Sequence, residues 1–78
     1  MEEMNLFGMD SKKADLEMVK RNGMALRFVK DQTPEICLAA VKDYGLVLEY
    51  VKNQTTDICL AAIKQNPEAK RFVRIALD

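Results

Sequence analysis

The sequence predicts an all-α fold: a short array of about three and a half two-helix repeats. The phrase Ile-Cys-Leu-Ala-Ala-Val-Lys at residues 36–42 returns at 58–64 with one substitution, giving a period of 22 residues. Each copy closely follows a threonine, a residue typical of helix N-caps. Self-similarity at a fixed period of this size is the signature of repeat architectures, whose stacked units share one core.

The 78 residues are predicted to form one domain of such units. Residues 1–10 align with the second half of a unit, and we expect a helix near residues 1–7. Three full units follow at 11–32, 33–54 and 55–76. A core of this size is marginal, and short helices are unstable alone, so each unit should depend on its neighbours.

The first helix of each unit is marked by a hydroxyl residue. Ser11, Thr33 and Thr55 align at the period, and each is predicted to be an N-cap that accepts a hydrogen bond from the first turn. Pro34 follows at a first helical position, where a missing N–H is tolerated. The first helices are predicted at 12–21, 34–43 and 56–65.

The second helix of each unit is predicted to begin at a shared break. Gly23, Gly45 and Pro67 occupy the same repeat position. Proline cannot adopt the positive φ of a left-handed helix end, so this position starts a new helix, with Asn66 as its N-cap. By repeat logic Gly23 and Gly45 start helices too. The second helices are predicted at 23–31, 45–52 and 67–77.

Positions that stay apolar from unit to unit predict the core. The terminal units are more polar at some of these positions, as expected where an end unit faces water instead of a neighbour. The predicted core residues are Leu16, Val19, Phe28, Val29, Leu38, Ala40, Val41, Tyr50, Val51, Leu60, Ala62, Ile63, Phe72 and Val73.

The two cysteines, Cys37 and Cys59, occupy one repeat position in adjacent units. Equivalent positions on packed helices lie about 8–10 Å apart, whereas a disulfide needs Cα atoms within about 7 Å. We therefore predict two reduced, buried thiols. The chain has no histidine, so we expect no zinc site and no cofactor.

The stretch at residues 36–51 resembles the tandem repeats named domain of unknown function 4116. In that family a similar first-helix phrase is followed by an Asn-Gly-type turn and a Leu-x-Tyr-Val phrase, and the resemblance covers about residues 14–74. It implies helical tandem units. The family has no known common activity, so the resemblance implies no catalytic residue. Such repeats occur in bacteria, phages, giant viruses and protists.

The composition argues against several functions. There is no histidine, the only serine is the predicted cap Ser11, and no glycine-rich phosphate loop exists, so we expect no enzyme. The formal net charge of zero gives no field toward nucleic acid or an anionic membrane. No apolar run spans a bilayer, and the first ten residues lack a secretory leader. A cytoplasmic protein is expected.

One row of positive charge is a candidate binding surface. It falls at two repeat positions three residues apart, and Glu49 interrupts it. The alternative is a solvated helix face. A tyrosine also stands where other units have asparagine, either covering the gap beside Gly45 or serving as an exposed anchor. The candidate binding residues are Arg27, Lys30, Tyr44, Lys52, Arg71 and Arg74.

The predicted function is a non-enzymatic protein-interaction module of unknown partner. One alternative is a small phage- or mobile-element-encoded inhibitor that binds a host defence protein. Another is a nucleic-acid binder that uses the basic face; no aromatic residue is expected to interleave that face as a stacking platform would require. Ile75 and Leu77 stand where inner units have polar connectors, which suggests a homodimer through the C-terminal end. All five methionines lie in the first third. Met1 is the start residue and the other four are predicted gap fillers, with a pliable binding surface as the alternative.

Overall fold

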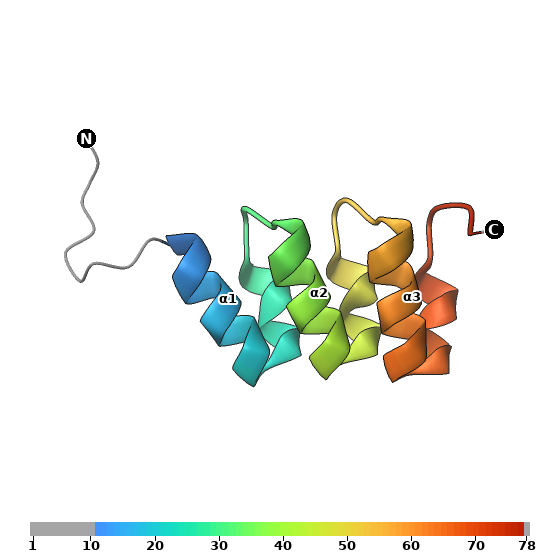
Figure 1. The fold of residues 1–78 in the computed structure, drawn as a ribbon, viewed down its shortest axis with the longest axis horizontal. Coiled ribbons are helices and arrows are strands. Elements are labelled where there is room, and N and C mark those ends of the chain that lie inside the picture. The colour runs from blue at the N-terminus through green and yellow to red at the C-terminus, as the bar shows by residue number, and fades with distance from the viewer. Residues whose placement is uncertain (1–10, 78) are drawn as a thin grey trace.

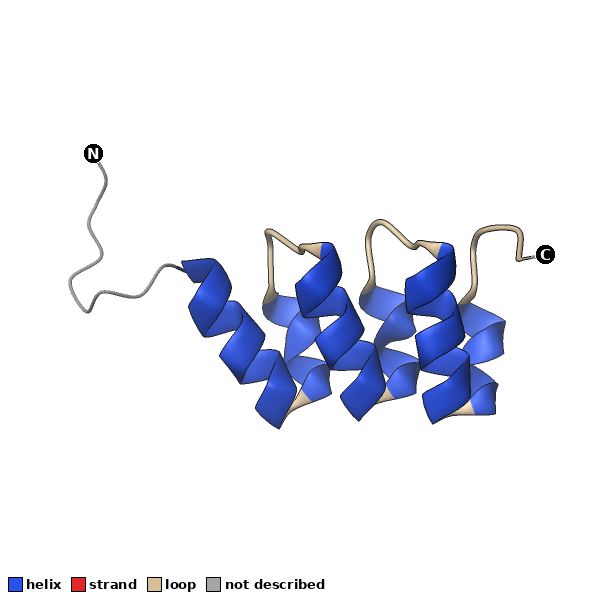
Figure 2. Ribbon diagram, viewed as in Figure 1, coloured by secondary structure: helices blue, strands red, loops and turns tan. Residues whose placement is uncertain are grey.

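The computed structural model describes residues 11–77 as a row of helical pairs (Figure 1). Its elements are α1 (Ser11–Arg21), η1 (Gly23–Phe28), α2 (Pro34–Asp43), η2 (Gly45–Tyr50), α3 (Thr56–Gln65) and η3 (Pro67–Phe72). The α-helices lie side by side in one layer, and the shorter η-helices form a second layer behind them. This part of the chain contains no strand (Figure 2). The all-α prediction is therefore confirmed.

The first helices lie where the sequence predicts them, because their signals are local. Thr33 Oγ1 accepts a hydrogen bond from the Ile36 amide at 3.2 Å, and Thr55 Oγ1 accepts one from Ile58 at the same distance. The helix α1 begins at Ser11, one residue earlier than predicted. The predicted cap made by the Ser11 side chain lies outside what the structure describes. The predicted half unit at 1–10 and its helix lie outside the described residues.

A single extended residue joins each α-helix to the η-helix that follows it. Its N–H closes the α-helix, and its carbonyl accepts the first hydrogen bond of the next one. Asn22 and Asn66 also cap with their side chains, accepting hydrogen bonds from the Met24 and Glu68 amides at 3.1 and 2.9 Å. Tyr44 holds the equivalent place without a side-chain cap. One residue in each unit therefore makes the whole turn from the α-helix to the η-helix.

The second helices are 3-10 helices of six residues, shorter than predicted. Their backbone bonds span three residues, as in Ala25 N to Asn22 O at 2.9 Å. A 3-10 helix has three residues per turn, so every third side chain lies on one line. In η1 that line is Gly23, Leu26 and the following Val29, all of which are buried.

The 3-10 geometry corrects the predicted core. Repeat position predicts that Phe28 and Tyr50 are buried, but their exposed fractions are 72% and 37%. Leu60 is also wrong, with 52% exposed, because no described element packs over the far side of α3. The core instead contains residues that the prediction omitted, among them Leu26, Ile36, Val47, Leu48 and Ile58. Val19, Val29, Ala40, Val41, Val51 and Ala62 are buried as predicted, while Leu16, Leu38, Ile63, Phe72 and Val73 are partly buried.

Adjacent units meet most closely at the two glycines. The Gly23 amide donates to Asp43 Oδ2 at 2.7 Å, and the Gly45 amide donates to Gln65 Oε1 at 2.6 Å. A Cβ at Gly23 would lie 2.5 Å from the carbonyl oxygen of Ala40 in the next unit. Only glycine leaves room for this approach.

The third unit differs at the matching positions. Pro67 replaces the glycine and has no N–H to donate. Lys70 replaces the buried Leu26 and Leu48, and its side chain is exposed. The last unit therefore lacks the groups that hold a following unit.

A glutamine in each connector bridges to the next unit. Gln54 Oε1 accepts hydrogen bonds from the Arg74 amide at 2.8 Å and the Cys59 thiol at 3.4 Å, and its Nε2 donates to the Phe72 carbonyl at 2.9 Å. Gln32 repeats this pattern one unit earlier. Each glutamine thereby ties the end of one η-helix to the connector before it.

Both cysteines are free and buried, as predicted. Burial removes water from the thiolate and raises the pKa of Cys37. Burial also raises the pKa of Cys59, although the nearby Arg74 charge opposes the shift. A thiol with a raised pKa and no access to solvent is a poor nucleophile.

The C-terminal residues fold back along the last unit instead of extending η3. Residues 73–77 form no helix, and Ile75 and Leu77 pack, partly buried, against the core of their own chain. These two side chains therefore present less free apolar surface than an outward-facing pair would.

Candidate binding surface

Two of the six predicted binding residues have structural roles. Lys52 Nζ donates to the Lys30 carbonyl at 3.2 Å. The Arg74 guanidinium donates to the carbonyls of Val51 and, at 3.4 Å, Glu49. Arg74 thus binds carbonyls at the end of η2, where positive charge is favourable, and Lys52 binds a carbonyl of the connector after η1. The two cations are committed within the fold and contribute little to a free surface.

Arg27 sits instead between two exposed aromatic rings. Its guanidinium carbon lies 5.1 Å from the centre of the Phe28 ring and 5.8 Å from that of Tyr50, which belongs to the next unit. Both distances are within cation–π range. Arg27 has no ion pair with any of residues 11–77, so its N–H groups remain available to an outside acceptor.

An arginine beside an aromatic ring recurs in the third unit, where the aromatic residue is less exposed. The Arg71 guanidinium carbon lies 5.7 Å from the centre of the Phe72 ring and pairs with Glu68 at 4.0 Å. Phe28, Tyr50 and Phe72 share one repeat position, so they follow one another along the η layer. We define the aromatic–arginine face as Arg27, Phe28, Tyr50, Arg71 and Phe72.

The expectation that no aromatic interleaves the basic row is therefore wrong. It depended on repeat position, which placed Phe28 and Tyr50 in the core because this position is aromatic in every unit. A period of three residues would have placed them outside, but nothing in the local sequence announces a 3-10 helix. The remaining basic residue, Lys30, is exposed and lies beyond the ring positions.

Tyr44 lies at the opposite end of the η-helices, at the turn between α2 and η2. Its Cβ is 3.1 Å from the place where a Cβ on Gly23 would stand, so it packs beside the close approach of the first two units. The ring is 38% exposed. The structure thus places Tyr44 apart from the aromatic–arginine face, beside Gly23 of the preceding unit.

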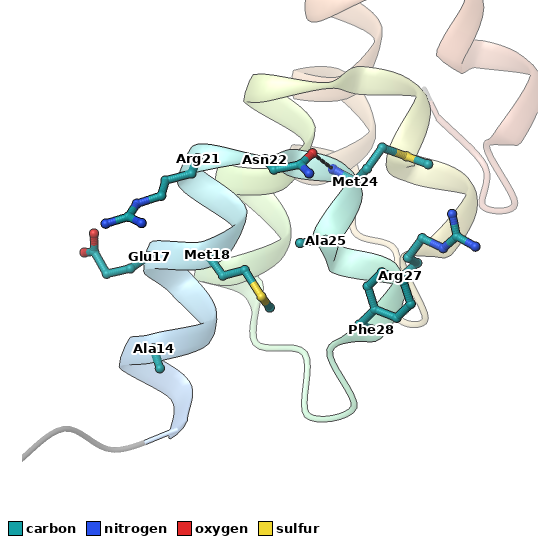
Figure 3. A pocket seen from close by; sticks show the side chains of 9 residues that line it. All are labelled: Ala14, Glu17, Met18, Arg21, Asn22, Met24, Ala25, Arg27 and Phe28. Carbon is teal, nitrogen blue, oxygen red and sulfur yellow. Dashed lines mark hydrogen bonds between the residues drawn. The ribbon is translucent and has the colours of Figure 1, made fainter. Parts of the chain in front are cut away.

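An apolar groove lies at the N-terminal end of the described array, between α1 and η1 (Figure 3). Its volume is about 680 Å³. Met18 projects from α1 toward η1, and Phe28 and Arg27 lie near the far end of η1. We call this the end groove. Because Arg27 and Phe28 belong to both, the end groove is continuous with the aromatic–arginine face.

The α1 side of the end groove is formed in part by repeat positions that are buried in the inner units. Ala14 and Met18 of α1 stand where α2 has Ile36 and Ala40, which are 1% and 0% exposed. Met18 is 39% exposed. The sequence showed these differences between units but gave no reason to group them into a site.

The described residues offer no other obvious chemistry. No cluster of histidine, cysteine or acidic side chains among residues 11–77 could hold a metal ion. Within the same residues, no helix has both the length and the apolar character needed to cross a membrane. The candidate site therefore consists of apolar, aromatic and guanidinium groups on the surface.

These features define a helical-repeat protein whose exposed side chains vary around a repeated core. The family model described as Domain of unknown function (DUF4116) matches residues 16–55 and again 33–74. The chain belongs to this family, and the overlapping matches agree with its tandem units. Neither a search of curated proteins nor a search of solved structures gave a match.

Proposed function

We propose that the chain is a non-enzymatic module that binds another protein through its aromatic–arginine face. The observation that carries the proposal is the exposure of Phe28 and Tyr50 around Arg27, which has no ion pair within residues 11–77. Arginine and tyrosine are enriched among residues that dominate binding energy, and large exposed apolar groups mark interaction sites. The absence of histidine and of a spare serine from the sequence supports a non-catalytic role.

The rigid array suits this role. The units are locked by glycine contacts and glutamine bridges, so the face costs little ordering entropy on binding. Charge on Arg27 would mainly speed association and select an acidic partner surface. A cytoplasmic setting accords with two buried free thiols. An inhibitor of a host protein, encoded by a phage or mobile element, is a special case that the identity of neighbouring genes would test.

The test is affinity capture from the native host followed by mass spectrometry. The intact chain serves as bait beside a double variant, Arg27→Glu with Phe28→Ser. We expect captured partners to bind the variant at least tenfold more weakly, equivalent to about 1.4 kcal/mol, with a nearly unchanged melting temperature. Arg74→Glu is unsuitable as a probe because it removes bonds that hold the fold.

A matched control makes the same chemical changes on α3. Lys64→Glu with Leu60→Ser replaces an exposed cation and an exposed apolar side chain away from the face. Partners should bind this control as they bind the unmodified chain. Loss of binding in the control with retention in the face variant would overturn the proposed surface.

A second candidate is single-stranded nucleic acid. The observation in its favour is the series of rings with adjacent arginines, since bases stack on aromatic side chains and guanidinium groups. The zero net charge and the commitment of Lys52 and Arg74 weigh against it. Fluorescence anisotropy with labelled oligonucleotides separates the two. An affinity falling at least about tenfold from 50 to 200 mM salt would favour nucleic acid.

A further inference from the structure

We propose that the end groove holds a short, acidic, amphipathic helical segment of the partner protein. This inference rests on the proposed function and names the part of the partner that the chain recognises. The apolar side of the segment would lie on Met18 and Met24, and its carboxylates would meet Arg21 and Arg27.

Two helices of the chain itself, η1 and η2, indicate the shape of a segment that would fit the end groove. Among residues 11–77 no element precedes α1, whereas η1 fills the corresponding place beside α2 and η2 fills it beside α3. Each of these is a six-residue helix that buries a leucine, Leu26 or Leu48, between units. A short helix with apolar residues on one side therefore fits the end groove by the same packing.

The apolar lining favours an incoming segment that differs from the chain's own η-helices. Met18 stands where α2 and α3 have the fully buried alanines Ala40 and Ala62. A methionine is longer, unbranched and polarisable, so it can adapt to more than one apolar partner side chain. Met24 lines the same groove on η1.

The charge requirement comes from Arg21. In inner units the corresponding residues are Asp43 and Gln65, whose side-chain oxygens accept the amide hydrogens of Gly23 and Gly45. Arg21 has only donors and cannot make that contact. It would bind an acceptor instead, and a carboxylate matches its planar fork best.

The described lining of the groove carries two arginines, Arg21 and Arg27, and one acidic residue, Glu17. Arg21 has no ion-pair partner among residues 11–77. The acidic lining residue Glu17 is paired with Lys20 at 4.0 Å. Arg27 places a second free guanidinium on the η1 side. An apolar groove whose described lining holds two guanidinium groups and one carboxylate is complementary to a helix with one apolar and one acidic face.

The test uses the intact chain labelled at its methionine methyl groups. The probe is an amphipathic peptide of about 12 residues with leucines on one face and glutamates on the other, compared with a lysine version. We expect the glutamate peptide to shift the Met18 and Met24 signals saturably and to bind at least tenfold more tightly than the lysine peptide. Arg21→Glu should weaken the glutamate peptide at least fivefold, whereas Lys64→Glu should not.

Three results would overturn the inference. The first is equal binding of the two peptides. The second is an unchanged Met18 signal at millimolar peptide, including the case in which contacts from residues 1–10 show that the chain fills its own groove. The third uses the captured partner: if Arg21→Glu binds it normally while Arg27→Glu with Phe28→Ser does not, the proposed function stands and the end-groove inference fails.

Discussion

At the scale of single residues, stability is concentrated in leucines that lie between units. Leu26 and Leu48 belong to η-helices, are completely buried, and separate one α-helix from the next. A cavity at such a place cannot collapse easily, because the helices on both sides are held by glycine contacts and glutamine bridges. How much a leucine of an η-helix contributes to the free energy of unfolding therefore depends on whether it lies on the buried side of that 3-10 helix.

Leu48→Ala should lower the free energy of unfolding by about 2–5 kcal/mol, enough to unfold much of so small a domain. Leu60→Ala, on an exposed side chain, should cost less than about 1 kcal/mol, and the half-buried Leu38 should fall between them. Urea denaturation followed by circular dichroism measures all three. An equal loss at Leu48 and Leu60 would contradict the assigned core.

The thiols provide a pH test of the same core. Because burial raises the pKa of Cys37 and Cys59 above the ordinary 9.0, the folded state holds these protons more tightly than the unfolded state does. Their contribution is complete below that value and is lost as pH rises above it. The urea midpoint should therefore drop from pH 8 to pH 10 more than in a Cys37→Ala, Cys59→Ala variant.

The same thiols should react slowly with a thiol reagent in the folded chain and completely after unfolding. A similar alkaline drop in the double variant would show that other groups cause it. A disulfide in freshly isolated protein would contradict both expectations.

The residue scale also shows where sequence-based prediction stops. The buried Val29 and Val51 follow from repeat position alone, because the same valine recurs in all three units. Phe28 and Tyr50 do not, because an aromatic at a repeated position is equally compatible with a core and with a surface. The period of the local helix decides between these, and that period is set by packing against the next unit.

At the scale of elements, the α-helices and η-helices differ in what determines them. The bounds of α2 and α3 follow from threonine caps and basic ends, which act within a few residues. The last carbonyls of η2 and η3 accept hydrogen bonds from Gln32 and Gln54 of the preceding connectors. Arg74 of the following unit also donates to carbonyls at the end of η2, those of Glu49 and Val51. These contacts span about twenty residues of sequence, so no local pattern predicts them.

Gln54→Ala should therefore release the end of η3. The variant loses hydrogen bonds to the Arg74 amide, the Phe72 carbonyl and the Cys59 thiol, at roughly 1 kcal/mol each. We expect a loss of about 2–3 kcal/mol in unfolding free energy and faster hydrogen exchange at the Arg74 amide. Asn53→Ala, next to it and exposed, is the control. Unchanged exchange at Arg74 would mean that the bridge contributes little.

At the scale of the whole molecule, the sequence predicts that two copies of the chain associate. The homodimer through Ile75 and Leu77 stays a prediction. Their packing against their own core limits the surface that they can offer, so a two-fold contact would have to recruit neighbouring apolar groups such as Leu60.

Sedimentation at about tens of micromolar protein tests the dimer, since an isologous contact of useful strength would persist there. A mass of two chains that returns to one in Ile75→Ser with Leu77→Ser would support it. A mass of one chain for the unmodified protein would rule out a stable dimer. The same runs on Lys64→Glu control for a general effect of surface charge.

The glycine contact has a consequence for how many units can be joined. A repeat surface can in principle add copies without limit and grow into a filament, the usual hazard of head-to-tail association. Here neither end can take part. Pro67 has no amide hydrogen to give, and Arg21 has no oxygen to receive one. The glycine contact between units therefore cannot be repeated at either end of residues 11–77.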